Sequence, residues 1–257
     1  MKKLYLDYNV ISYLRSGKIP MLTNIFEGSS KEQIVVFSPA HLEDIAASAK
    51  RDKIDSTIID AEIDFLAKIA GRNALRPIND NDLVEYDETP QDCYKRVVDN
   101  YDANELAEAL EALVLADANQ NPMGNPREMN NIAPENVLQN ISYRELIALC
   151  LVSQRIIDKS ESADVLSWQF KDIRNRFRVF EAYVNLAANL LEKIGYYREQ
   201  QDKARSRLHD VSHIIYGAYC DTFVSADKKL IKKAKAIYEL LDIHTLVLTD
   251  KEFCGLA

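Results

Sequence analysis

The chain of 257 residues is long enough to bury a sizeable core, in one large domain or in two small ones. Apolar residues make up 47% of the sequence and charged residues 28%, with seven Gly and seven Pro, which excludes a disordered chain and favours a helix-rich globular protein. The net charge of −8 argues against a uniformly basic nucleic-acid-binding surface, and the four cysteines form no Cys-x-x-Cys pair that would indicate zinc.

The sequence also predicts where the protein resides. No stretch approaches the roughly 20 apolar residues that span a bilayer, and Asp7 and Asn9 interrupt the first apolar segment too early for a signal peptide. Scattered cysteines are typical of reduced thiols in the cytosol. We therefore expect a soluble cytoplasmic protein with no membrane association.

Short β-branched runs alternate with helical periodicity over about the first eighty residues. These runs predict strands at residues 4–6, 34–37 and 75–78, the last at a sheet edge because Pro77 lacks the N–H of a central ladder. Ser38 and Pro39 predict the cap and first turn of a helix. Further helical segments are expected at residues 10–14, 21–26 and 53–70.

The pattern from about residue 80 to residue 200 is almost entirely helical. Strand signals are missing there, and a single long helix is expected over residues 160–197. The α/β alternation then returns, with helices expected at 205–219 and 227–241 and strands at 222–225 and 245–248. Residues 1–80 and 201–257 are therefore predicted to form one α/β domain, interrupted by an all-helical insertion over residues 81–200.

Four carboxylates stand where a strand ends or a helix begins: Asp7, Glu43, Asp210 and Asp227. Ligands bind at the carboxyl ends of the strands in a parallel sheet, so these side chains are expected to converge there. Like charges at close range push one another toward the neutral form, and a divalent cation relieves that repulsion. Oxygen ligands without His or Cys at ligand spacing favour Mg²⁺ or Mn²⁺. A lone Asp after a strand is usually a turn or a cap, so the prediction depends on all four together.

Several short segments resemble, in order and spacing, the motif series of the PIN-domain nucleases. The resemblance covers roughly the first fifty and the last fifty residues. It implies a three-layer α/β sandwich around a mainly parallel sheet and a ribonuclease activity that depends on Mg²⁺ or Mn²⁺. An insertion of about 120 residues departs from compact PIN domains, so knowledge of substrates and partners does not transfer. The matching segments are LDYNVIS at 6–12, SPAHLE at 38–43, DVSH at 210–213 and CDTFVSAD at 220–227.

The resemblance also implies roles for single residues. The four carboxylates would be catalytic and would hold the metal, while Asn9 and Ser225 would orient ligands or substrate. Asp221 opens the strand at 222–225 and is a further candidate ligand. His213 shares a helical face with Asp210 and could contact that carboxylate or the substrate. A hydrogen-bonded core histidine is the competing interpretation. Lys228 begins a lysine cluster that is either a phosphate-binding groove or a solvated helix face.

The sequence therefore predicts a metal-dependent nuclease, more specifically a ribonuclease, that hydrolyses phosphodiester bonds with water activated by Mg²⁺ or Mn²⁺. A haloacid-dehalogenase-type phosphatase would need a second Asp where Asn9 stands. A ribonuclease-H-like enzyme would begin with several hairpin strands. A non-catalytic module that binds an antitoxin or a ribonucleoprotein is the main alternative. The expected partners are RNA or DNA, a protein bound by the helical insertion, and further copies of the chain.

Overall fold

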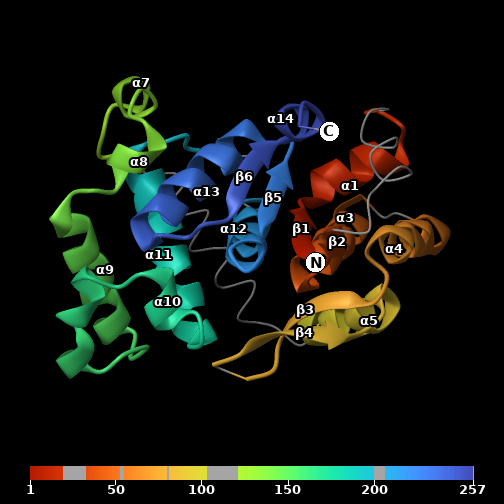
Figure 1. Ribbon diagram of the computed structural model, residues 1–257, viewed down its shortest axis with the longest axis horizontal. Coiled ribbons are helices and arrows are strands. Elements are labelled where there is room, and N and C mark those ends of the chain that lie inside the picture. The colour runs from red at the N-terminus through yellow and green to blue at the C-terminus, as the bar shows by residue number, and fades with distance from the viewer. Residues whose placement is uncertain (20–32, 53–54, 80, 103–120, 200–205, 257) are drawn as a thin grey trace.

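The computed structural model describes residues 1–19, 33–52, 55–79, 81–102, 121–199 and 206–256. Four strands of the described residues form a parallel sheet in the order β2-β1-β5-β6 (Figure 1). The beginning and the end of the chain therefore lie side by side, as the red and blue strands in Figure 1 show. These strands are β1 (Lys2–Leu6), β2 (Gln33–Val36), β5 (Thr222–Ser225) and β6 (Leu246–Thr249).

Helices make up much of the remaining chain. The predicted helix over residues 21–26 lies outside the described residues, whereas the helix expected at Pro39 begins at that residue. In the first part of the chain the helices are α1 (Tyr8–Arg15), α3 (Pro39–Asp52), α4 (Ser56–Ala70) and α5 (Pro90–Asp102). Later helices are α7 (Pro126–Met129), α8 (Pro134–Val137), α9 (Ile141–Ser153), α10 (Phe170–Ile173), α11 (Phe177–Ile194), α12 (Ser206–Gly217), α13 (Lys228–Leu241) and α14 (Asp250–Cys254).

Side chains of the central strands alternate between the two faces of the sheet, as the two-residue period of a strand requires. Tyr5 and Phe223 belong to the core that includes α11, α12 and α13. Leu6 and Val224 belong to the core that includes α1 and α4. Because both faces are covered, the buried positions of these strands are mostly apolar. The described residues therefore form a mixed α/β protein with helices on both faces of a parallel sheet, which confirms the predicted α/β class and the parallel central sheet.

One strand lies inside the segment that was expected to be all-helical. β3 (Asn73–Pro77) and β4 (Leu83–Asp87) form a separate antiparallel pair, joined to the end of β2 by a single bridge between Phe37 and Ala74. The prediction that residues 81–200 contain no strand is therefore wrong, because β4 lies within them. Its side chains are mostly exposed, so no apolar run marked it in the sequence, and pairing with β3 forms the strand. β4 does not join the four-stranded sheet.

The single long helix predicted over residues 160–197 is also wrong. Two 3-10 turns and α10 come first, and only then does α11 begin. The helix is interrupted although the apolar periodicity continues, because Asp158 with Glu161, and Gln169 with Asp172, form capping boxes that start new elements. α11 ends at Gly195, whose φ of 87° places it in the left-handed region that favours glycine.

The helices of residues 121–199 share the core of the sheet. Leu151 of α9 and Phe180 and Leu191 of α11 belong to the same buried cluster as Tyr5 and Phe223. α9 packs on α11, which in turn packs on α12 and α13. None of the helices in the described ranges has both the length and the apolar character needed to cross a membrane.

Candidate metal centre

Asp7 lies at the carboxyl end of β1 and is only 2% exposed. Its backbone N–H donates to Val224 O at 2.8 Å, which fixes its position against β5. Its carboxylate accepts from Ser225 Oγ at 2.6 Å and from Asn9 Nδ2 at 3.4 Å. Burial raises the pKa of Asp7, and the charge of His213 and the Ser225 hydrogen bond only partly offset this effect. The sequence placed Asp7, Asn9 and Ser225 together, and the structure brings them into contact.

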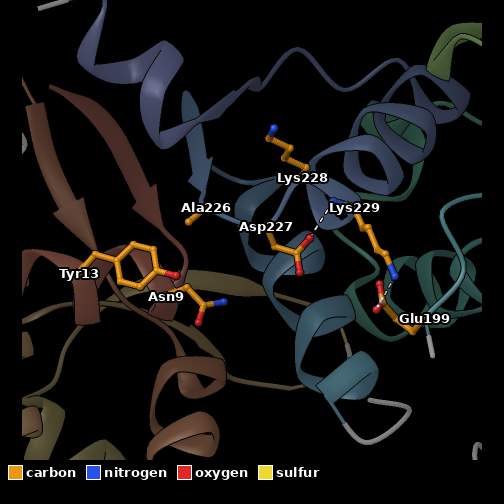
Figure 2. A pocket seen from close by; sticks show the side chains of 7 residues that line it. All are labelled: Asn9, Tyr13, Glu199, Ala226, Asp227, Lys228 and Lys229. Carbon is orange, nitrogen blue, oxygen red and sulfur yellow. Dashed lines mark hydrogen bonds and ion pairs between the residues drawn. The ribbon is translucent and has the colours of Figure 1, made fainter. Parts of the chain in front are cut away.

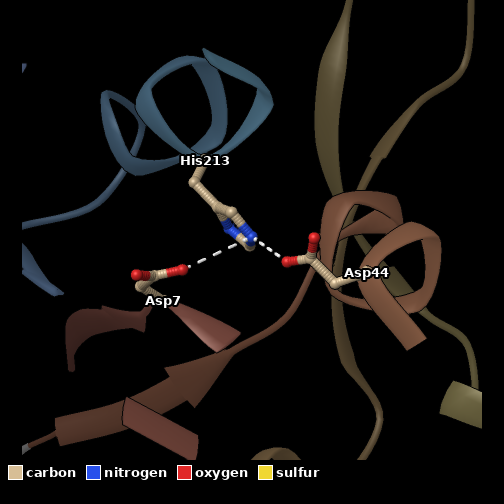
Figure 3. Close-up of side chains that lie close together, drawn as sticks. All are labelled: Asp7, Asp44 and His213. Atoms are coloured by element: carbon tan, nitrogen blue, oxygen red, sulfur yellow. Dashed lines mark hydrogen bonds and ion pairs between the residues drawn. The ribbon is translucent and has the colours of Figure 1, made fainter. Parts of the chain in front are cut away.

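His213 lies between two carboxylates from different elements (Figure 3). Its Nε2 is 2.8 Å from Asp44 Oδ2 and 3.6 Å from Asp7 Oδ1. One ligand atom from each of the three residues lies within 4.8 Å of the others. Two oxygens and one nitrogen thus lie close together, supplied by Asp7 at the end of β1, Asp44 of α3 and His213 of α12. We call this group the Asp7–Asp44–His213 cluster.

The charges in this cluster are strongly coupled. Burial lowers the pKa of His213, but the hydrogen bond to Asp44 and the charges of Asp7, Asp44 and Asp210 outweigh burial and raise it to about 9. Burial raises the pKa of Asp44, but its hydrogen bond to His213 and the positive charge of that ring lower it below its usual range. The raised pKa favours an imidazolium, whose charge compensates the neighbouring carboxylates.

Two predicted carboxylates lie around this cluster. Burial raises the pKa of Asp210 far above its usual range, and the charges of Asp7 and Asp227 add to the shift, whereas Lys233 opposes it. Asp227 caps α13, because its Oδ1 accepts from Lys229 N at 2.7 Å and from Leu230 N at 3.2 Å. Asp210 therefore lies close enough to Asp7 for their charges to interact, and Asp227 has a structural role as a helix cap.

The carboxylate that α3 directs toward Asp7 is Asp44, which sequence reasoning missed in favour of Glu43. Glu43 is outside the Asp7–Asp44–His213 cluster, and its Oε2 is 3.9 Å from His209 Nδ1. Its predicted catalytic and metal-binding role stays a prediction. The one signal in the sequence was the spacing from His41 to Asp44, because residues three apart share a helical face and His41 is buried against β1.

The structure places Asp221 far from this centre, which corrects its predicted role as a further ligand. Asp221 precedes β5, and its Oδ2 accepts from Lys3 N at 2.7 Å. Asp7 lies four positions after Lys3 along the strand, which corresponds to roughly 13 Å. Metal–oxygen bonds are about 2–2.6 Å long, so one ion cannot contact both carboxylates. Asp221 instead holds the beginning of β1 against β5.

A pocket of about 380 Å³ opens beside the carboxylates, between α1 and the beginning of α13 (Figure 2). Lys228 is exposed there, whereas Lys229 Nζ is 3.1 Å from Glu199 Oε2. Lys233 is buried against Glu192, so the lysines from residue 228 to 235 form neither a single groove nor a uniformly solvated face. The pocket is lined by Asn9, Tyr13, Glu199, Ala226, Asp227, Lys228 and Lys229.

The donor set fits a divalent cation. Asp7 and Asp44 offer carboxylate oxygens, the ligands that Mg²⁺ and Mn²⁺ prefer. A cation would offset the burial, and the lesser repulsion between carboxylates, that raise the pKa values of Asp7 and Asp210. The position at the carboxyl end of β1 is where ligands bind in parallel α/β sheets. No protein-family model, curated protein or solved structure matches this chain.

Proposed function

We propose that this protein is a metal-dependent phosphodiesterase, specifically a ribonuclease of the PIN type, with its centre at Asp7, Asp44 and Asp210. The observation that carries the proposal is the convergence of these acidic groups at the end of β1. Burial raises the pKa values of Asp7 and Asp210, so their negative charge is costly, whereas Asp44 keeps its charge through its contact with His213. Groups kept at such a cost are candidates for function.

The fold supports the same proposal. The resemblance in motif order implies a sandwich around a parallel sheet, and β2-β1-β5-β6 is a parallel sheet with helices on both faces. The resemblance placed acidic residues at the ends of β1 and β5, where Asp7 and Asp227 lie. A PIN-type arrangement accounts for both features.

In the proposed centre Asp7 and Asp44 hold the cation. The chemistry that Mg²⁺ or Mn²⁺ would supply there is polarisation of a phosphoryl oxygen and activation of a water. Ser225 and Asn9 orient the Asp7 carboxylate through their hydrogen bonds. Asp210, whose raised pKa favours the protonated form, is placed to exchange a proton with water or with the leaving oxygen.

The pocket next to the centre is the proposed site for the RNA strand. Asn9 joins the two, because it lines the pocket and donates to Asp7. The exposed ammonium of Lys228 offers a contact for a phosphate at the pocket entrance. The cation and Lys228 together would offset the local negative charge that otherwise repels a polyanion.

Cleavage of a labelled single-stranded RNA tests this function. We expect cleavage with Mn²⁺, loss of cleavage with chelator, and recovery when Mn²⁺ is added in excess. A double variant with Asp7→Asn and Asp227→Asn should fold and lose activity by several orders of magnitude. Full cleavage by the folded double variant would place any nuclease activity at another site. RNA binding without cleavage by the native chain would instead favour a non-catalytic module.

A further inference from the structure

We propose that His213 is itself a metal ligand, so that Asp7, Asp44 and His213 form a mixed oxygen–nitrogen centre that prefers Mn²⁺ to Mg²⁺. Tyr5, Ser38 and His41 would act as positioning residues for its imidazole. The inference rests on the metal site of the proposed function, but it does not depend on phosphodiester cleavage.

The position of the ring is the first observation. His213 is 1% exposed, and its Nε2 is directed at the two carboxylates that any cation at the end of β1 would use. Figure 3 shows the imidazole ring of His213, on α12, between the Asp7 and Asp44 side chains. A cation placed among these oxygens would replace the proton of Nε2, which would leave to solvent.

The second observation is a buried chain of hydrogen-bonding groups behind the ring. Tyr5 Oη is 2.9 Å from His213 Nδ1 and 2.7 Å from Ser38 Oγ. Ser38 Oγ is in turn 3.4 Å from His41 Nδ1. All four side chains are fully or almost fully buried. The chain joins β1, the end of β2, α3 and α12, so it holds the ring from the side opposite the carboxylates.

At the His41 end of this series of hydrogen-bonding groups, donor and acceptor are fixed. Leu6 O can only accept, so His41 Nε2 donates to it at 2.7 Å. The Ser38 backbone N–H can only donate, so His41 Nδ1 accepts from it at 3.1 Å. The neutral tautomer of His41 is thereby set, and its Nδ1 is the acceptor at which the chain ends.

This arrangement of donors and acceptors favours the tautomer of His213 that carries its proton on Nδ1 and can bind a cation through Nε2. When the Ser38 hydroxyl donates to His41 Nδ1, the Tyr5 hydroxyl donates to Ser38 Oγ. The Tyr5 oxygen then accepts from Nδ1–H of His213. Every hydroxyl then has a partner, and once Nε2 of His213 has lost its proton, its lone pair can bind a cation. Metal-binding histidines commonly donate their other N–H to such a partner, which fixes the tautomer and the ring orientation.

A nitrogen ligand changes which cation the site selects. Mg²⁺ prefers oxygen ligands and octahedral geometry with several waters, whereas imidazole is a better ligand for first-row transition metals. Affinity in such N/O sites rises along the series that begins at Mn²⁺. We therefore expect Mn²⁺ to bind at least about tenfold more tightly than Mg²⁺.

Calorimetric titration of the full chain with Mn²⁺ and with Mg²⁺, without nucleic acid, tests the inference. His213→Gln should lose tenfold or more in Mn²⁺ affinity and change Mg²⁺ affinity little, while His209→Gln, one turn earlier on α12, should keep the native preference. Tyr5→Phe should weaken Mn²⁺ binding by about 10–100-fold, the usual effect of losing such a support. Tyr196→Phe is the matched control, because the Tyr196 hydroxyl is buried and has no hydrogen-bond partner among the described residues. It should bind Mn²⁺ like the native chain.

A spectroscopic measurement keeps the inference testable even where a variant fails to fold. Electron spin-echo modulation of Mn²⁺ bound to the native protein should show coupling to a directly bound imidazole nitrogen. Its absence, or equal Mn²⁺ preference in native and folded His213→Gln protein, would overturn the nitrogen ligand. Mn²⁺ binding through nitrogen without any RNA cleavage would support the inference and contradict only the proposed reaction. No binding of either cation would contradict both.

Discussion

The imidazolium of His213 stabilises Asp7 and Asp44 in the metal-free chain, so its protonation is coupled to stability. Its pKa is raised from 6.5 to about 9 on folding, despite burial, because Asp44, Asp7 and Asp210 favour the charged ring. A raised pKa contributes stability that is fully present below pH 6.5 and is lost as pH rises through about 9. The contribution is on the order of 3 kcal/mol.

We therefore predict that the free energy of unfolding of the metal-free protein falls between pH 6 and pH 9.5, as measured by urea titration. The raised pKa values of Asp7 and Asp210 act in the same direction, since their cost grows as pH rises above the ordinary range of a carboxyl. The lowered pKa of Asp44 acts only at acid pH. His213→Gln should flatten the profile. A native stability that is constant or rises over this range would contradict the charge assignment.

Lys228 offers a second test at the scale of one residue. Lys228→Gln should weaken RNA binding and lower the slope of log affinity against log salt by about 1, because one phosphate contact is removed. The measurement is fluorescence anisotropy with single-stranded RNA at several salt concentrations. Lys171→Gln is the control, because Lys171 is exposed on α10 and does not line the pocket. Equal slopes in the two variants would remove Lys228 from the substrate path.

The residues of the centre were predictable from the sequence to different degrees. Asp7 could be located, because the apolar run of β1 ends at it. The choice between Glu43 and Asp44 could not be made, because neighbours in a helix point about 100° apart and the rotation of α3 is set by tertiary packing. Leu42 and Ile45, which flank both acids, are buried in the core that includes β1 and α4, and they leave Asp44 facing His213.

The secondary-structure elements were also predictable from the sequence to different degrees. Strands buried on both faces were predicted within one or two residues, because continuous apolar runs mark them. β4 was missed because its side chains are mostly exposed and only pairing with β3 forms the strand. The breaks before α11 were missed because local capping boxes, rather than a loss of apolar periodicity, end the elements there.

A buried ion-pair group joins two elements next to the centre. Lys233 of α13 contacts Glu192 of α11 at 2.5 Å and Glu199 at 3.2 Å, and all three side chains are nearly buried. Burial lowers the pKa of Lys233, but the charges of both glutamates outweigh burial and raise it. Removal of the lysine would take away the buried ion-pair partner of Glu192 and leave Glu199 paired with Lys229.

Lys233→Met is therefore expected to destabilise the protein by about 3–5 kcal/mol, the usual cost of breaking a buried pair from one side. Lys235→Met on the same helix should cost little, because Lys235 is partly exposed and forms no ion pair with the described residues. Urea unfolding at neutral pH compares the two. A loss below 1 kcal/mol for Lys233→Met would show that water solvates the glutamates.

At the scale of the whole molecule, the helices from residue 121 to 199 and the sheet share one hydrophobic cluster. We predict a single cooperative unfolding transition rather than separate melting of the α/β part and the helices of residues 121–199. Trp168, the one tryptophan of the sequence, is 7% exposed within that cluster and reports on the helical part. Its fluorescence and the far-ultraviolet circular dichroism should give the same midpoint. Two separated midpoints would establish an independently folded insertion.

The central claim is that the carboxylates at the end of β1 form a metal-dependent phosphodiesterase centre. Its most direct test is the rate of single-stranded RNA cleavage in Mn²⁺ by Asp7→Asn and by Asp221→Asn. The two variants remove one charge each from opposite ends of the paired strands β1 and β5, and an asparagine at 221 can still accept from Lys3 N. The account predicts a loss of several orders of magnitude for Asp7→Asn and a native rate for Asp221→Asn. A native rate for folded Asp7→Asn would contradict it.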